Sequence, residues 1–359
     1  MQKESVWHID ISLLVMLLLL CLVSLGILYS ASGEDMELLW RQSLRIFIGL
    51  VIMLLLAQAS PASLNRWSPW LFGIGLLLLI LVLVIGIVGK GAQRWLDFGF
   101  FRFQPSEIMK LGVPMMVAWI LSRHPLPMRW GDLLLALVAV IVPALLVARQ
   151  PDLGTAILIA VSGLLIIFLA GIRWRYLILA TILAVASSFV LWEFLLDYQR
   201  RRVLTLFDPW SDPLGAGYHI IQSLIAVGSG GFYGKGWLNG SQSQLEFIPE
   251  RSTDFIFAVI AEEFGLFGCS LLVLLYVLLV IRCLFISFYA GDTWSRLLTG
   301  SLALTFFFYL FVNIGMVSGI LPVVGVPLPL VSYGGTSMVT LMAGFGILMS
   351  VNTHRRFMS

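Results

Sequence analysis

The chain has 359 residues, of which 60% are hydrophobic and only 11% are charged, and its mean hydropathy is +0.99. A soluble domain carries about a quarter charged residues, so this composition excludes one and indicates a protein that folds in lipid. The formal net charge of +3 gives no indication of a nucleic-acid partner, and the three cysteines all lie in apolar runs, which argues against a disulfide framework or a thiolate metal site.

A scan of the chain with a window of about 20 residues finds ten apolar runs, which we interpret as membrane spans. The sequence therefore predicts an all-α polytopic membrane protein with about ten transmembrane helices. An even number of spans places both chain ends on one side, and Lys3, Arg355 and Arg356 favour the cytoplasm for that side. The predicted spans are 11–30, 46–60, 69–88, 108–121, 133–148, 155–171, 177–196, 268–289, 297–317 and 337–353.

The entry to the fourth span carries several polar residues. Arg102 and Gln104 precede Pro105, which suits a first helical turn, and Glu107 and Lys110 follow three residues apart on one helix face. Two interpretations fit this pattern. The residues could be an interfacial ion pair that helps a helix enter the bilayer, or they could line a polar cavity inside it.

The entry to the sixth span is marked by Asp152, which follows Pro151 and precedes Leu153-Gly154-Thr155. An aspartate in this place is expected to cap the helix. A role in a site is the alternative.

The segment 197–254 is the one stretch long enough to build a site outside the spans, and the predicted topology places it on the outer side. Loops of this length in a compact fold are usually functional or disordered. Seven aromatic residues that could be buried argue for order, and 222–226 could form an interfacial helix. We therefore predict an ordered periplasmic cap on a single membrane domain that covers 1–359. The aromatic residues are Phe207, Trp210, Tyr218, Phe232, Tyr233, Trp237 and Phe247.

The cap ends at Asp254, which is followed directly by seven apolar residues. A carboxyl group at the lip of the hydrocarbon region is desolvated, which raises its pKa toward a value useful for a general base. The alternative is again a helix cap. Near the other end of the chain, 319–335 holds three prolines and four glycines, so it cannot be a regular helix. Irregular backbone at membrane depth is tolerated only where it is buried in protein or lines a cavity, so a cavity is expected there.

Motifs of soluble enzymes are absent from the sequence. The glycine cluster 228–234 lacks the G-x-G-x-x-G spacing and the preceding strand of a nucleotide site. The four histidines are far apart in sequence, and none forms an H-E-x-x-H helix, which argues against a zinc hydrolase.

The polar edges described above, together with 90–96, resemble the SEDS proteins (shape, elongation, division and sporulation). The resemblance covers essentially the whole chain. Segments 217–223 and 242–246 are closer to the elongation members of the family than to the division members. The resemblance rests on Asp208-Pro209, Asp212-Pro213-Leu214-Gly215-Ala216-Gly217-Tyr218-His219, Thr253-Asp254-Phe255 and Pro327-Leu328-Pro329, in the order and spacing of the family.

The resemblance implies a peptidoglycan glycosyltransferase that polymerises lipid II at the periplasmic face of the bacterial cytoplasmic membrane. It also implies a class B penicillin-binding transpeptidase as partner, within the elongation complex. The α-linked donor gives a β-linked product, so the reaction is inverting and requires no covalent intermediate. No cofactor follows with certainty, although a divalent cation, Mg²⁺ or Mn²⁺, is compatible with the resemblance.

The resemblance also assigns site residues. Asp254 matches the catalytic aspartate of the family, and we interpret it as the general base. The polar cavity positions of the family fall on Arg102, Gln104, Glu107, Lys110 and Asp152. Lys110 and Arg102 could hold the pyrophosphate, with Glu107 orienting Lys110.

Two other functions are compatible with parts of this pattern. A flippase for lipid-linked precursors also has many spans, intramembrane charges and a broken helix. It would need a polar path open to both faces, whereas the polar positions here gather on one. A non-catalytic scaffold for a transpeptidase is the second alternative, although a scaffold has no need of Asp254 at the hydrocarbon edge.

Overall fold

The computed structural model describes residues 8–89, 92–97, 99, 102–125, 128–172, 204–213, 215–245, 247–248 and 250–354, with 175–176, 178, 182, 185–186, 193 and 200 between them. Its helices are α1 (Ile11–Ala31), α2 (Met36–Gln58), α3 (Pro61–Ile85), α4 (Pro105–Ser122), α5 (Trp130–Ala148), α6 (Leu153–Leu169), α9 (Ala216–Ser229), α10 (Ser241–Gln244), α11 (Ile256–Phe288), α12 (Thr293–Val317) and α13 (Thr336–Thr353), with a 3-10 turn, η1, at Pro209–Ser211.

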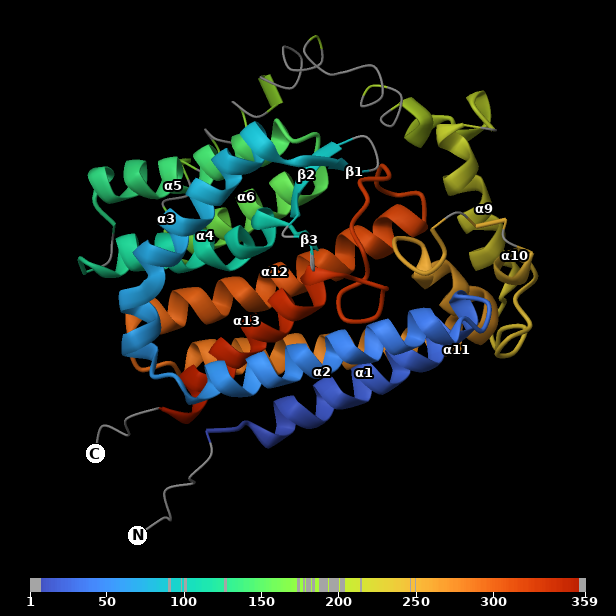
Figure 1. Ribbon diagram of the computed structural model, residues 1–359, viewed down its shortest axis with the longest axis horizontal. Helices are drawn as coiled ribbons and strands as arrows, with labels where there is room; N and C mark the ends of the chain where they lie inside the picture. The colour runs from blue at the N-terminus through green and yellow to red at the C-terminus, as the bar shows by residue number, and fades with distance from the viewer. Residues whose placement is uncertain are drawn as a thin grey trace.

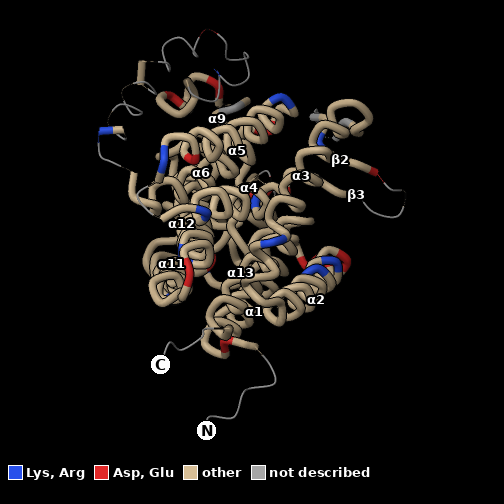
Figure 2. Tube along the Cα trace, turned by 90° about the vertical axis from the view of Figure 1, so that its left-hand side faces the viewer, with Lys and Arg blue, Asp and Glu red and all other residues tan. Residues whose placement is uncertain are grey.

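Seven of the described helices are long and apolar enough to cross a membrane: α1, α2, α3, α5, α11, α12 and α13. The apolar α6 is shorter, at 17 residues, and α4 carries the Glu107 and Lys110 charges. Charged residues are sparse along these helices (Figure 2). The prediction of a mostly helical, multi-pass membrane protein is confirmed. A total of ten spans stays a prediction, because 177–196 lies largely outside the described residues.

Three helices begin earlier than the apolar runs indicate. Helix α2 begins at Met36 rather than 46, α3 at Pro61 rather than 69, and α11 at Ile256 rather than 268. The missed starts of α2 and α3 contain polar and charged side chains among apolar ones, and side-chain caps fix where these helices begin. Asp35 accepts hydrogen bonds from the backbone of Glu37 and Leu38 at 2.9 and 3.1 Å, and Ser60 caps α3. A hydropathy window registers only the apolar part of such a helix.

A small antiparallel sheet separates α3 from α4, which the all-α prediction did not include. Its strands are β1 (Ile87–Gly89), β2 (Ala92–Asp97) and β3 (Arg102–Phe103), in the order β1-β2-β3. Ile87 pairs with Trp95, and Leu96 pairs with Phe103. The sheet contacts α3 and α4, lies at one end of these helices (Figure 1), and leads the chain directly into Gln104 and α4.

The bundle has two distinct ends (Figure 1). At one end, which we call the terminal end, the rings of His8 and His354 stack with centroids 3.8 Å apart. Beside them the buried Asp10 carboxylate accepts hydrogen bonds at 2.8 Å from both Arg282 of α11 and Asn352 of α13. Helices α9 and α10 lie at the opposite end, which we call the cap end. Both ends of the described chain therefore lie together, as an even number of spans requires.

The cap end is ordered by contacts between α11 and 231–236, a segment that overlaps the glycine cluster. Helix α11 is interrupted at Gly265, which has φ +63° and ψ −163°. Around this break, backbone N–H groups of Lys235 and Gly236 donate to the carbonyls of Glu262 and Glu263, each at 3.0 Å. A β-carbon on Gly234 would lie 2.1 Å from the Glu263 carbonyl oxygen, so only glycine allows this approach.

Two buried glutamates of α11 accept further hydrogen bonds at the cap end. Glu262 is fully buried and accepts hydrogen bonds from the Lys235 ammonium at 2.7 Å, from Ser241, and from the backbone N–H groups of Gln242 and Ser243. The neighbouring Glu263 accepts a hydrogen bond from Ser30 of α1. The helix expected at 222–226 lies within α9, which packs on α11.

Candidate functional site

The segment between α12 and α13 contains no regular helix over 319–335, as its prolines and glycines predict. Side chains from three helices satisfy its backbone. Ser24 donates to the carbonyl of Val331 at 2.9 Å, Gln42 to that of Ser332 at 3.3 Å, and Tyr276 to that of Pro329 at 2.5 Å. Irregular backbone inside the bundle is thus buried in protein and supplied with donors. We call 319–335 the broken segment.

Glu107 and Lys110 form a buried ion pair on α4. Their Oε1 and Nζ atoms lie 2.7 Å apart, and their side chains are only 6% and 13% exposed. This low exposure excludes the interfacial surface pair that the sequence allowed as one interpretation. Exposed ion pairs contribute little to stability, whereas breaking a buried one is costly. The Oε2 atom of Glu107 has no hydrogen-bond partner among the described residues.

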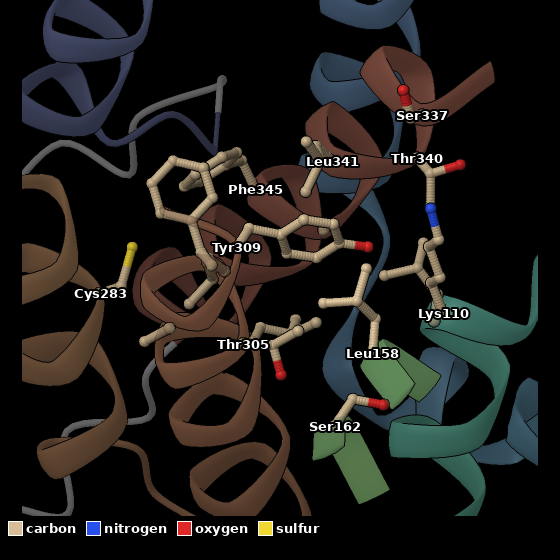
Figure 3. A pocket seen from close by; sticks show the side chains of 16 residues that line it. Lys110, Leu158, Ser162, Cys283, Thr305, Tyr309, Ser337, Thr340, Leu341 and Phe345 are labelled. Atoms are coloured by element: carbon tan, nitrogen blue, oxygen red, sulfur yellow. The ribbon is translucent and has the colours of Figure 1, made fainter. Parts of the chain in front are cut away.

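The pair adjoins a small cavity between α4, α6, α11, α12 and α13. The Tyr309 ring crosses this cavity toward Lys110 (Figure 3), and the ammonium lies 5.6 Å from the ring centroid. Most of the lining is apolar, with hydroxyl groups near Lys110 and around the wall. A cation at the edge of an apolar chamber suits a ligand with an anionic head and a hydrocarbon body. The hydroxyls come from Ser162, Thr305, Ser337 and Thr340.

Asp152 is both a helix cap and part of a polar cluster. Its Oδ1 accepts a hydrogen bond from the backbone of Thr155 at 3.2 Å, which caps α6. Its Oδ2 accepts a hydrogen bond from the Gln104 amide at 3.1 Å and lies 3.6 Å from the Arg94 guanidinium. The backbone of Arg102 lies in β3, and its side chain is outside the described part of the chain. The structure thus joins Gln104 and Asp152 across two helix entries.

Asp254 lies between the cap and α11. The N-cap residue of helix α11 is Phe255, so Asp254 precedes that N-cap residue by one position. Its carboxylate lies beside Gly325 of the broken segment, where an added β-carbon would be 3.4 Å from Oδ2. Its carbonyl oxygen accepts a hydrogen bond from the Asn313 amide at 2.9 Å. The side chain is partly exposed, which suits a base that must meet a substrate.

The broken segment also connects Asp254 with the Asp152 cluster. A β-carbon on Gly154, two residues after Asp152, would lie 2.7 Å from the carbonyl oxygen of Val324. Val324 and Gly325 are consecutive, so one short stretch of backbone touches the α6 entry and the Asp254 carboxylate. The helix entry that carries Asp152 and the Asp254 carboxylate therefore adjoin the same stretch of the broken segment.

No group of three or more His, Cys, Asp and Glu side chains with metal-binding geometry occurs among the described residues. The residues that the structure describes thus offer no preformed protein ligand set for Mg²⁺ or Mn²⁺.

Comparison with known proteins identifies the family. The family model FTSW_RODA_SPOVE, described as a cell cycle protein, matches residues 5–357. The chain belongs to this family, which is the SEDS family.

Individual members of the SEDS family are similar over nearly their whole length. The chain is 55% identical over 361 aligned positions to the peptidoglycan glycosyltransferase MrdB of Escherichia coli K12, covering 99% of this chain and 98% of that one. A structure described as a peptidoglycan synthase complex matches with a TM-score of 0.84 and 35% identity, covering 98% and 99% of the two chains. The crystal structure of Thermus thermophilus RodA matches with a TM-score of 0.74 and 30% identity, with the same coverage.

Three side chains of this SEDS protein stand in the site without having been predicted. Arg94 reaches Asp152 from β2, while Tyr309 and Asn313 lie on α12. A buried asparagine in an apolar span is costly unless it has a partner, so the isolated Asn313 in the run 297–317 was a usable signal. Tyr309 gave none, because tyrosine is common in membrane helices.

Proposed function

We propose that this peptidoglycan glycosyltransferase polymerises lipid II at the outer face of the cytoplasmic membrane, with Asp254 as general base. That the chain is a peptidoglycan glycosyltransferase follows from its full-length similarity to the MrdB enzymes. The observation that carries the proposal is the placement of Asp254, at the junction of cap and bundle and against the broken segment. A partly exposed carboxylate at that junction can meet a sugar hydroxyl that approaches from outside the membrane.

The chemistry needs little more than a base and positive charge. A sugar hydroxyl is a poor nucleophile, so its attack on the anomeric carbon requires proton removal, which we assign to Asp254. The carbon–oxygen bond to the isoprenoid pyrophosphate breaks as the new glycosidic bond forms on the opposite face, which inverts the configuration. The departing pyrophosphate carries the negative charge, and a fixed cation stabilises it.

We assign the cation to Lys110. Its ammonium stands at the edge of the apolar cavity, so a pyrophosphate bound there would leave the isoprenoid chain facing hydrocarbon. Glu107 fixes the position of the ammonium through the 2.7 Å contact. Gln104 and Asp152 form the neighbouring polar wall, and Arg102 is proposed as a second phosphate-binding cation.

The remaining features of the proposal concern organisation. The partner is a class B penicillin-binding transpeptidase in the elongation complex, consistent with the similar structure described as a peptidoglycan synthase complex. The chain forms one domain over 1–359 with a periplasmic cap over 197–254, and both termini are cytoplasmic. Stacking of His8 on His354 supports a common side for the two ends.

A direct test uses the purified chain with lipid II, alone and with its transpeptidase, followed by gel separation of glycan strands. We expect strands from the wild type and a loss of about 10²- to 10⁴-fold in rate for Asp254→Asn, because the amide keeps the size but cannot accept a proton. Lipid II movement across vesicles without strand formation would favour a flippase. Wild-type rates from the Asn variant would remove Asp254 from the mechanism.

A further inference from the structure

Asn313 of α12 is fully buried, and its side-chain amide is held in one orientation. The Nδ2 atom donates to the carbonyl oxygen of Asp254 at 2.9 Å and to that of Val326 at 2.8 Å. Rotating the amide by 180° would place its oxygen against two oxygens, so the two contacts fix which atom faces them. Both donor hydrogens of the amide are therefore used on backbone.

The two carbonyls belong to the two non-helical segments that meet at the Asp254 carboxylate. One precedes α11, and the other is the broken segment, whose Gly325 lies beside Oδ2 of Asp254. Asn313 thus holds Asp254 itself and the residue next to Gly325. Neither segment is helical here, so the position of the carboxylate depends on local turn bonds and on contacts between the two segments, of which those of Asn313 reach Asp254 itself.

The helix that carries Asn313 also connects Asp254 with the part of the site around Lys110. Tyr309, which lies beside the Lys110 ammonium, is one helical turn earlier on α12. Residues four apart lie on the same face of a helix, so one rigid element contacts both halves. A helix in this role fixes the separation between base and cation better than a loop would.

We propose that Asn313 is a positioning residue, which sets the Asp254 carboxylate at its working distance from the acceptor hydroxyl. The inference rests on the assignment of Asp254 as the base in the proposed function. A general base must come within about 2.6–3.2 Å of the hydroxyl oxygen whose proton it removes, and a displacement of about 1 Å can cost about 10²-fold in rate. Asn313 itself touches neither substrate nor the reacting atoms.

The test compares Asn313→Leu with Gln42→Met in full-length protein supplied with its transpeptidase and lipid II. Gln42 is a matched control, since it is also fully buried and donates to the broken segment, at the Ser332 carbonyl, but it does not contact Asp254. We expect Asn313→Leu to lower kcat about tenfold or more with the KM for lipid II within about twofold, because the Lys110 half is unchanged. Gln42→Met should keep kcat within about twofold at a similar loss in Tm.

Two further variants keep the result interpretable. If the leucine variant does not fold, Asn313→Ser replaces it, because serine is smaller than asparagine and keeps one hydrogen-bond donor. The same changes in kcat and KM are then expected. Asp254→Asn is measured alongside. If Asp254→Asn is inactive while Asn313→Leu and Gln42→Met lose kcat only in proportion to stability, or if the loss falls on KM, the positioning role is overturned and the base assignment stands. Near-wild-type activity in Asp254→Asn overturns both.

Discussion

Gly325 and Asp254 meet where the broken segment touches the start of α11. A β-carbon on Gly325 would lie 3.4 Å from Oδ2 of Asp254, and the glycine has φ +74°, a conformation that other residues adopt at a cost. The residue beside the proposed base therefore has no side chain, and a side chain introduced at position 325 would contact the Asp254 carboxylate.

Alanine at position 325 should lower activity more than stability. Gly325→Ala introduces strain of about 1–2 kcal/mol and a methyl group in contact with Asp254. Gly319→Ala is the matched control, since Gly319 has φ +69° in the same segment but its β-carbon would meet Ile220 and Leu224. We expect similar losses in Tm for both, and a fall in kcat for lipid II polymerisation at 325 alone. Equal kcat values for the two variants would contradict this.

Breaking the buried pair on α4 should have a large effect. Lys110→Met leaves the Glu107 carboxylate buried without its cation, which costs about 3–5 kcal/mol, whereas an exposed pair contributes about 0–1 kcal/mol. Arg41→Met provides the comparison, because Arg41 and Glu37 form an exposed pair on α2 with side chains 61% and 72% exposed. Thermal unfolding and polymerisation assays should show losses in both for Lys110→Met and little change for Arg41→Met. Small effects from both would argue against a buried, functional pair.

Glu262 should be needed for the cap to stay docked. Its carboxylate accepts hydrogen bonds from the Lys235 ammonium and from two backbone N–H groups, and Glu262→Gln directs an NH₂ group at part of this donor set. A buried network broken in this way costs about 3–5 kcal/mol. We expect a lower Tm and faster proteolysis within 231–245, with Glu37→Gln as the exposed control. Unchanged proteolysis of the cap would show that other contacts hold it.

The proposed orientation can be tested by thiol labelling. Single cysteines at Asn239 and His354, in a background with Cys21, Cys269 and Cys283 replaced, are treated with a membrane-impermeant reagent on intact spheroplasts. The three native cysteines are buried, so their replacement needs small apolar residues. We expect labelling at 239 and none at 354. The opposite pattern would invert the topology, and labelling at both positions would require an odd number of spans.

Much of the fold could be predicted because a membrane helix must carry its apolar stretch in one continuous run. The same reading missed the starts of α2 at Met36 and of α3 at Pro61, where polar side chains are interspersed and capping by Asp35 and Ser60 sets the boundary. It also missed the break at Gly265, which lies before the predicted span 268–289 and directly after Glu262, Glu263 and Phe264. The break depends on pairing with 231–236, which is distant in sequence.

Site residues could be predicted where an ionisable side chain lies at the end of an apolar run. Glu107, Lys110, Asp152 and Asp254 all stand at helix entries, where a charge next to an apolar run is conspicuous. The spacing of Glu107 and Lys110 predicted that these two share a helix face, but how they relate to Asp152 and Asp254 could not be predicted, because that relation passes through the broken segment and α12. Asn313 acts through two backbone carbonyls, and no sequence pattern records that kind of partnership.

The stacking of His8 on His354 makes the described chain nearly a closed ring. Asp10, Arg282 and Asn352 hold this closure from three helices, so it does not depend on the rings alone. A short linker could join the two ends, and new ends could be opened at an exposed turn such as the one between α1 and α2. Such a circular permutant would keep every helix in place while moving both termini to the cap end. Attachments next to His8 and next to His354, by contrast, would crowd the same small area.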